Sequence, residues 1–69
     1  MQIETLKELG QTIKKARKTQ CLTQKDLALT LGTSIRLIVE LEKGERGVRI
    51  DTILKACKLL GLVIDISEK

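Results

Sequence analysis

Apolar residues recur at helical spacing in four segments of the chain, and an alternating pattern replaces that spacing near the C-terminus. In the first segment, four apolar residues are separated by three, four and three positions: Leu6, Leu9, Ile13 and Ala16. This spacing aligns them on one face, so a helix is predicted from about Glu4 to Thr19. Gly10 lies inside it at a cost of roughly 1 kcal/mol relative to alanine, which the buried face can outweigh.

Two short helices are predicted next, joined by a tight turn that contains glycine. Thr23 can cap a helix over residues 24–31, because its hydroxyl can accept from a free N–H of the first turn. Asp26 adds negative charge near the positive start of this helix. Ser34 is placed to cap the next helix, which is expected to end at Lys43. The residues expected to point inward from the first of the two are Leu27, Ala28 and Leu31.

A basic loop leads to a fourth predicted helix, from about Ile50 to Leu60, after which the apolar period changes to two. The alternation predicts a strand over residues 62–67 with no partner strand in its own chain. Because a lone strand leaves backbone groups unpaired, the same strand of a second copy is the expected partner across a twofold axis. The sequence thus predicts a homodimer with a two-stranded antiparallel ribbon, or alternatively a frayed tail. The dimerisation residues would be Leu62, Val63, Ile64 and Ile66.

The chain is short enough to form one domain only. With 69 residues and no aromatic side chain, it can bury only about 60% of its unfolded surface, which favours stabilisation by a second chain. The predicted organisation is a single domain over residues 1–69, with a helical bundle over 4–61 and the dimerisation strand after it. No apolar run approaches the roughly 18 residues of a membrane helix, and no signal peptide is evident, so we expect a cytoplasmic protein.

The two cysteines do not suggest metal chemistry. Cys21 and Cys57 lack CxxC spacing, and no histidine is present to complete a set of four zinc ligands. Both are expected to be reduced packing residues, Cys57 beside Ile53, Leu54 and Leu60. Without histidine, an activated nucleophile or a glycine-rich phosphate loop, we expect neither an enzyme nor a cofactor.

The net charge of +4 is unevenly distributed. Residues 11–49 hold nine Lys and Arg against four acidic residues, whereas the remainder has a small acidic excess. A polyanion would therefore face the middle of the chain, although solvated helix surfaces would give the same distribution. The latter alternative applies most directly to Lys14, Lys15 and Lys18.

The third predicted helix has unusual residues on its outer face. At about 100° per residue, the residues facing outward are Ile35, Arg36, Val39, Glu40 and Lys43, opposite a core face of Leu37, Ile38 and Leu41. In a DNA major groove, Ile35 and Val39 would suit thymine methyl groups and Arg36 a guanine edge. Glu40 could accept from a cytosine amino group, or only repel phosphate. The alternative is a protein interface.

Groups that flank this helix are expected to contact DNA phosphates: the backbone amide of Gln24, together with Ser34, Lys43, Arg46 and Arg49. Arg17 is expected to form a bidentate bridge with Glu42, which would hold the first helix to the end of the third.

The string "LTQKDLALTLGTSIRLIVELEKG" resembles the Cro/repressor-type (Xre) helix-turn-helix family. The resemblance implies an all-α, lambda-repressor-like bundle of four or five helices that binds a palindromic operator as a dimer. It also implies Gln24 on a phosphate, base contacts from Ile35, Arg36, Val39 and Glu40, and the bridge between Arg17 and Glu42.

The closing part, "GVRIDTILKACKLLGLVIDIS", resembles the narrower HipB-type antitoxins. That resemblance implies a repressor that also binds a HipA-like serine/threonine kinase toxin, with exposed Leu29 as a candidate contact. Arg49 departs from the family, since Ser or Thr usually caps the fourth helix there. The alternatives are a stand-alone Xre-family regulator and a helix-turn-helix module reused for protein interaction.

Overall fold

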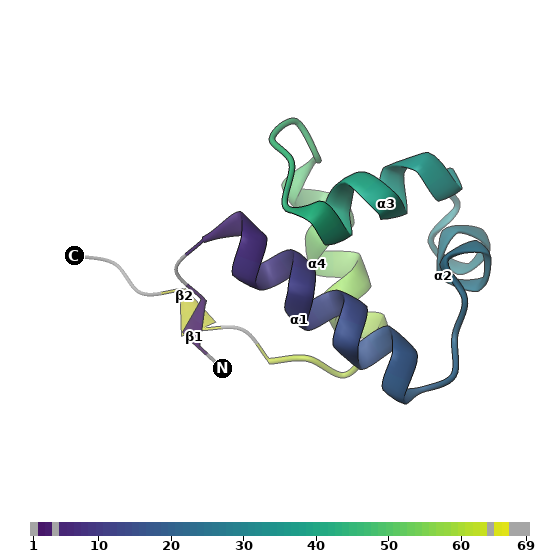
Figure 1. Cartoon of the computed structure of the whole chain (residues 1–69), viewed down its shortest axis with the longest axis horizontal. Helices are drawn as coiled ribbons and strands as arrows, with labels where there is room; N and C mark the ends of the chain where they lie inside the picture. Colours follow the sequence, from purple (N-terminus) through teal and green to yellow (C-terminus); the bar gives the residue numbers. More distant parts are fainter. Residues whose placement is uncertain (1, 4, 64, 67–69) are drawn as a thin grey trace.

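The computed structural model describes residues 2–3, 5–63 and 65–66, and these form a small all-α bundle with a short contact between the chain ends (Figure 1). The elements in chain order are β1 (Gln2–Ile3), α1 (Leu6–Thr19), α2 (Gln24–Leu31), α3 (Ile35–Lys43), α4 (Ile50–Leu59) and β2 (Asp65–Ile66). The helices α2 and α3 have the bounds predicted from the sequence, and α4 ends one residue earlier.

Helix α1 begins two residues later than predicted, because Thr5 is its N-cap. The backbone of Thr5 is extended, and its hydroxyl accepts a hydrogen bond from the N–H of Glu8 at 3.1 Å. A capping hydroxyl of this kind satisfies one of the free N–H groups at a helix start. The sequence carried this signal as a threonine followed three residues later by glutamate.

Helix α2 begins with a reciprocal cap. The Thr23 hydroxyl accepts from the N–H of Asp26 at 2.9 Å, and the Asp26 carboxylate accepts from the N–H of Thr23 at 2.9 Å. The backbone hydrogen bond from Thr23 and then that from its hydroxyl hold the pKa of Asp26 below its ordinary value of 3.8. The helix ends at Gly32, whose φ of 68° is left-handed, so the chain can turn sharply into α3.

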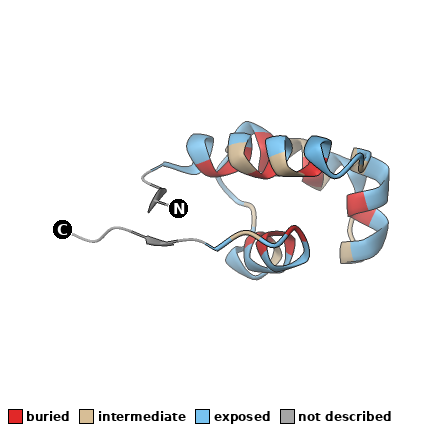
Figure 2. Ribbon diagram, turned by 90° about the horizontal axis from the view of Figure 1, so that it is seen from below, coloured by how far each residue is buried: buried red, intermediate tan, exposed pale blue. Residues whose placement is uncertain are grey.

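All four helices contribute to one aliphatic core, and their buried faces turn toward one another (Figure 2). The fully enclosed side chains Ile13, Leu27 and Ile38 come from three different helices. The other members are Leu9, Ala28, Leu41, Ile53, Ala56, Cys57 and Leu60. Burial raises the pKa of the Cys57 thiol, which keeps it protonated as a packing residue.

Three predicted core positions are wrong. Leu6 is 44% exposed, in the first turn of α1, whose backbone lies close to Gly44. Leu54 is 53% exposed, since it follows buried Ile53 by one position and therefore points about 100° away from it. Cys21 is exposed in the turn after α1. The inward positions Leu31 and Leu37 are only half-buried.

Gly10 allows α1 and α3 to approach closely. A β-carbon at this position would lie 2.5 Å from the carbonyl oxygens of both Leu41 and Glu42. Those oxygens belong to the last turns of α3, so only a residue without a side chain fits against them. The glycine that looked like a defect in the helix is therefore a packing requirement of the α1–α3 contact.

The two ends of the described chain pair with each other. β1 and β2 lie parallel, with Gln2 opposite Asp65 and Ile3 opposite Ile66. The prediction that the C-terminal strand has no partner in its own chain is therefore wrong, because the N-terminal residues supply one. Residue Ile64 of the predicted strand lies outside the described residues, and the antiparallel ribbon with a second copy stays a prediction. Leu62 packs against the core, while Val63 is 74% exposed.

Candidate nucleic-acid interface

Helix α3 presents a mixed apolar and charged face to solvent. Ile35 is 45% exposed and the Arg36 side chain is 89% exposed, whereas Val39 is half-buried. On the opposite side, Ile38 and Leu41 are buried in the core, which fixes the rotation of the helix. The structure thus places the predicted base-contacting residues on one accessible surface, where Ile35 and Arg36 are exposed and Val39 and Glu40 are half-buried.

Arg36 and Glu40 form an exposed ion pair that the sequence analysis did not anticipate. The Arg36 Nε atom lies 3.7 Å from Glu40 Oε2, one helical turn along α3. An exposed pair of this kind contributes only a few tenths of a kcal/mol, so a stronger acceptor can draw the guanidinium away. Spacing of four residues on one helix face was the signal available in the sequence.

Both ends of α3 are closed by capping residues. The Ser34 hydroxyl accepts from the N–H of Leu37 at 3.1 Å, and its own O–H hydrogen is left to donate to another group. Gly44 ends the helix with a left-handed φ of 74°. The predicted phosphate contact from Ser34 is compatible with its observed role as a cap.

A buried cluster joins α3 to the two preceding helices. Arg17 Nε donates to Glu42 Oε2 at 2.6 Å, Nη2 donates to Oε1 at 3.3 Å, and Nη1 donates to the carbonyl oxygen of Leu22 at 2.7 Å. The side chains of Arg17 and Glu42 are only 8% and 3% exposed. The expected bidentate bridge is therefore the geometry found, and it is shielded from solvent.

Gln24 belongs to the same cluster, which sequence reasoning missed. Its side-chain amide donates to Glu42 Oε1 at 3.1 Å, so this side chain supports α3 from the first turn of α2. The predicted phosphate contact concerned the backbone N–H of Gln24, which lies at the positive start of α2 and has no intrahelical acceptor. The spacing between Gln24 and Glu42 gave no local signal, because the contact spans two helices.

The basic groups after α3 are exposed. Lys43, Arg46 and Arg49 all present their side chains to solvent. Arg49 is the N-cap of α4 but makes no capping hydrogen bond with its side chain; instead, its Nη2 atom lies 3.3 Å from Asp51 Oδ2. The loop between α3 and α4 thus carries two guanidinium groups beside the C-terminal end of α3.

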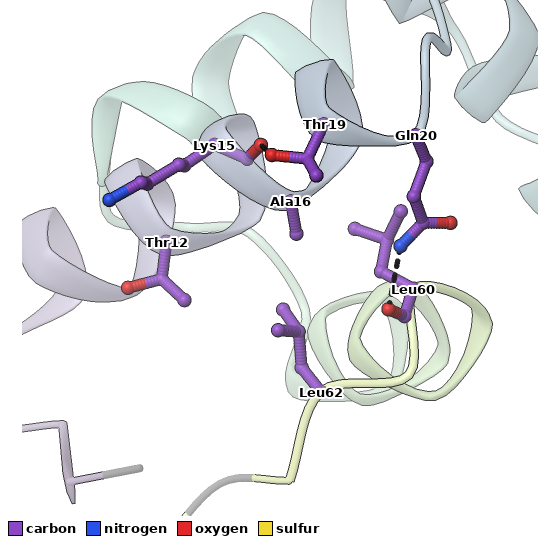
Figure 3. Close-up of a pocket in the computed structure, with 7 residues that line it drawn as sticks. All are labelled: Thr12, Lys15, Ala16, Thr19, Gln20, Leu60 and Leu62. Atoms are coloured by element: carbon purple, nitrogen blue, oxygen red, sulfur yellow. Dashed lines mark hydrogen bonds between the residues drawn. The ribbon is translucent and has the colours of Figure 1, made fainter.

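Two grooves in the described part of the chain have no residue of α3 in their lining. One, of about 500 Å³, runs between α1 and the segment after α4; its Ala16, Leu60 and Leu62 side chains form an apolar floor, and Gln20 donates to the Leu60 carbonyl oxygen across one end (Figure 3). No three His, Cys, Asp or Glu side chains gather within the described residues to hold a metal ion. No helix in that part of the chain is long and apolar enough to cross a membrane.

Comparisons with known proteins agree with this geometry. Residues 10–65 match the family described as Helix-turn-helix domain. The chain is 38% identical over 64 residues to a protein of Sinorhizobium fredii (strain NBRC 101917 / NGR234) named Uncharacterized HTH-type transcriptional regulator y4mF, covering 93% of this chain and 84% of the relative. Neither match bears on the narrower resemblance to HipB-type antitoxins. This chain belongs to the helix-turn-helix family of transcriptional regulators.

Proposed function

We propose that the protein is a sequence-specific DNA-binding repressor that places α3 in the major groove of a palindromic operator. The observation that carries this proposal is the outer face of α3, where exposed Ile35 and Arg36 lie beside half-buried Val39. Aliphatic side chains contact thymine methyl groups, and arginine forms two hydrogen bonds with guanine O6 and N7. Neither Ile35 nor Arg36 belongs to the core formed by the described residues.

Flanking groups would hold the helix in register. Gln24 through its backbone N–H, Ser34 through its hydroxyl, and the side chains of Lys43, Arg46 and Arg49 are the proposed phosphate contacts. Glu40 would accept from a cytosine amino group once Arg36 leaves it for guanine. Because phosphate contacts release counterions, affinity should fall steeply as salt concentration rises.

Two arginine variants test this assignment. Operator fragments selected from random DNA are titrated by fluorescence anisotropy. Arg36→Ala should cost about 1–3 kcal/mol on the operator and relax specificity at one base pair, whereas Arg46→Ala should weaken operator and random DNA alike. Equal losses on both DNAs for Arg36→Ala, or a binding constant insensitive to salt, would contradict the proposal.

We further propose that the protein acts as a homodimer whose half-sites are about 10 bp apart, or a multiple of this. Support comes from the small size of the domain and from exposed Val63 beside the C-terminal segment. Sedimentation equilibrium with Val63→Asp tests the proposed dimer contact, because the Val63 side chain lies outside the core and its replacement leaves the bundle intact. A variant that remains as dimeric as the parent would count against a dimer contact at residues 62–66.

The narrower role we propose is that of the antitoxin of a HipA/HipB-type operon. It would repress its own operon and neutralise a HipA-like kinase toxin. Its support is the resemblance of residues 47–67 to HipB-type antitoxins. The stand-alone regulator is favoured by the relative, whose name mentions transcription regulation alone. Co-expression with the product of the adjacent reading frame distinguishes them: a stable complex with a kinase-like protein supports the antitoxin, and its absence supports the solitary regulator.

A further inference from the structure

A second groove of about 380 Å³ lies between the C-terminal parts of α2 and α4, lined by Thr30, Leu31, Lys55, Lys58 and Leu59. We propose that it is a docking site for an acidic segment of a partner protein that inserts an aliphatic side chain between the two helices. This inference goes beyond the DNA-binding function and uses none of its proposed contact residues.

The groove combines an apolar interior with a basic wall. Leu31 is half-buried and Leu59 is 42% exposed, so both can accept an aliphatic side chain. Lys55 and Lys58 are three residues apart on α4 and therefore lie on the same face of that helix. Long lysine side chains cover apolar surface with their methylene groups while their ammonium groups reach solvent.

The positive charge of this wall is not balanced within the part of the chain that the structure describes. Neither Lys55 nor Lys58 has a carboxylate within ion-pair distance there, and Asp51, one turn before Lys55, is paired with Arg49. A carboxylate supplied from outside would thus meet two available ammonium groups. Charge complementarity of this kind selects an acidic partner and steers its approach.

The larger groove beneath α1 offers no comparable signal. Its rim consists of Thr12, Thr19 and Gln20, with Lys15 as its single charged residue (Figure 3). DNA is also a poor match for the α2–α4 groove. In Figure 1, α3 lies along the top of the bundle whereas the chain leaves α4 at the bottom, so a duplex held by α3 lies away from the C-terminal end of α4.

Three synthetic peptides of equal length test the proposal against the full chain. The first carries two leucines and two glutamates on one helical face, the second replaces the glutamates by glutamine, and the third replaces the leucines by alanine. Methyl NMR spectra should show shifts at Leu31 and Leu59 with the first peptide alone. Equal binding of all three, or shifts centred on Leu62, would overturn the assignment.

Charge-reversal variants complete the test. Lys55→Glu/Lys58→Glu should weaken binding of the first peptide by at least roughly tenfold while operator affinity stays unchanged. The matched control, Lys14→Glu/Lys15→Glu, should bind the first peptide about as tightly as the parent. Circular dichroism shows whether each variant is folded.

Loss of operator binding in the Lys55→Glu/Lys58→Glu variant would assign these lysines to DNA. Loss of dimerisation would make the occupant a second copy, whose residues 64–68 are also apolar and acidic. Either result overturns the proposal without touching the role of α3.

Discussion

Replacing Arg17 by methionine would leave the Glu42 carboxylate buried with one hydrogen-bond donor instead of three. In the parent protein, two donors come from Arg17 at 2.6 and 3.3 Å, and the third is the Gln24 amide at 3.1 Å. Methionine approximates the length of the arginine stem but carries no charge. The variant therefore separates electrostatic loss from loss of packing.

The expected cost of Arg17→Met is about 3–5 kcal/mol, the usual range when one partner of a buried pair is removed. The parent should lie in the lower part of the 5–15 kcal/mol range of small domains, so the variant should keep at most a few kcal/mol of stability near 25 °C. Arg17→Met/Glu42→Leu should recover much of the loss, because no buried charge remains. Recovery is incomplete, since the Gln24 amide and the Leu22 carbonyl oxygen lose their partners.

Urea unfolding followed by far-ultraviolet circular dichroism measures these differences, because the chain has no Trp, Tyr or Phe to report by fluorescence. Arg49→Met is the matched control: it breaks a pair whose side chains are 81% and 59% exposed, so it should cost less than about 1 kcal/mol. If Arg17→Met is no more destabilising than this control, burial does not decide the strength of the pair and the reasoning fails.

Two further substitutions test helix packing and capping by the same method. Gly10→Ala should destabilise by about 1–3 kcal/mol despite the better helix propensity of alanine, because its β-carbon would meet the Leu41 and Glu42 carbonyl oxygens at 2.5 Å; a stabilised variant would show that α1 and α3 are farther apart. Asp26→Asn should lower the urea midpoint at neutral pH. Because the folded pKa of Asp26 lies below 3.8, its contribution is full above the unfolded pKa and is lost as pH falls through the folded value. The two midpoints should therefore converge in acid, and a pH-independent gap would exclude a role for the charge.

Local patterns predicted the helices well because their signals lie within a few residues of each end. Thr23 and Ser34 both precede helices that they cap, and Gly32 and Gly44 both follow helices that they end. The start of α1 was misplaced only because the capping signal of Thr5 was overlooked. The first turn of α1 lies close to Gly44, 38 positions after Leu6, and no helical periodicity predicts that contact.

For the candidate interface too, the sequence predicted what depends on one helix but not the contacts between helices. Wheel positions were enough to place Ile35 and Arg36 outside, because the opposite face supplies Ile38 and Leu41 to the core. The contact of the Gln24 side chain with Glu42 could not be inferred, since it depends on how α2 crosses α3. The pairing of the chain ends was missed for a related reason: two residues are too few to show alternation.

The contrast between the two cysteines makes the protein convenient to label. Cys21 is exposed in the α1–α2 turn, whereas Cys57 is buried and its thiol has a raised pKa. Because the thiolate is the reacting form, brief maleimide treatment of the folded chain should attach a single dye at Cys21. The dye would sit just before the helix-turn-helix, so energy transfer to an end-labelled duplex could give the orientation of each bound subunit.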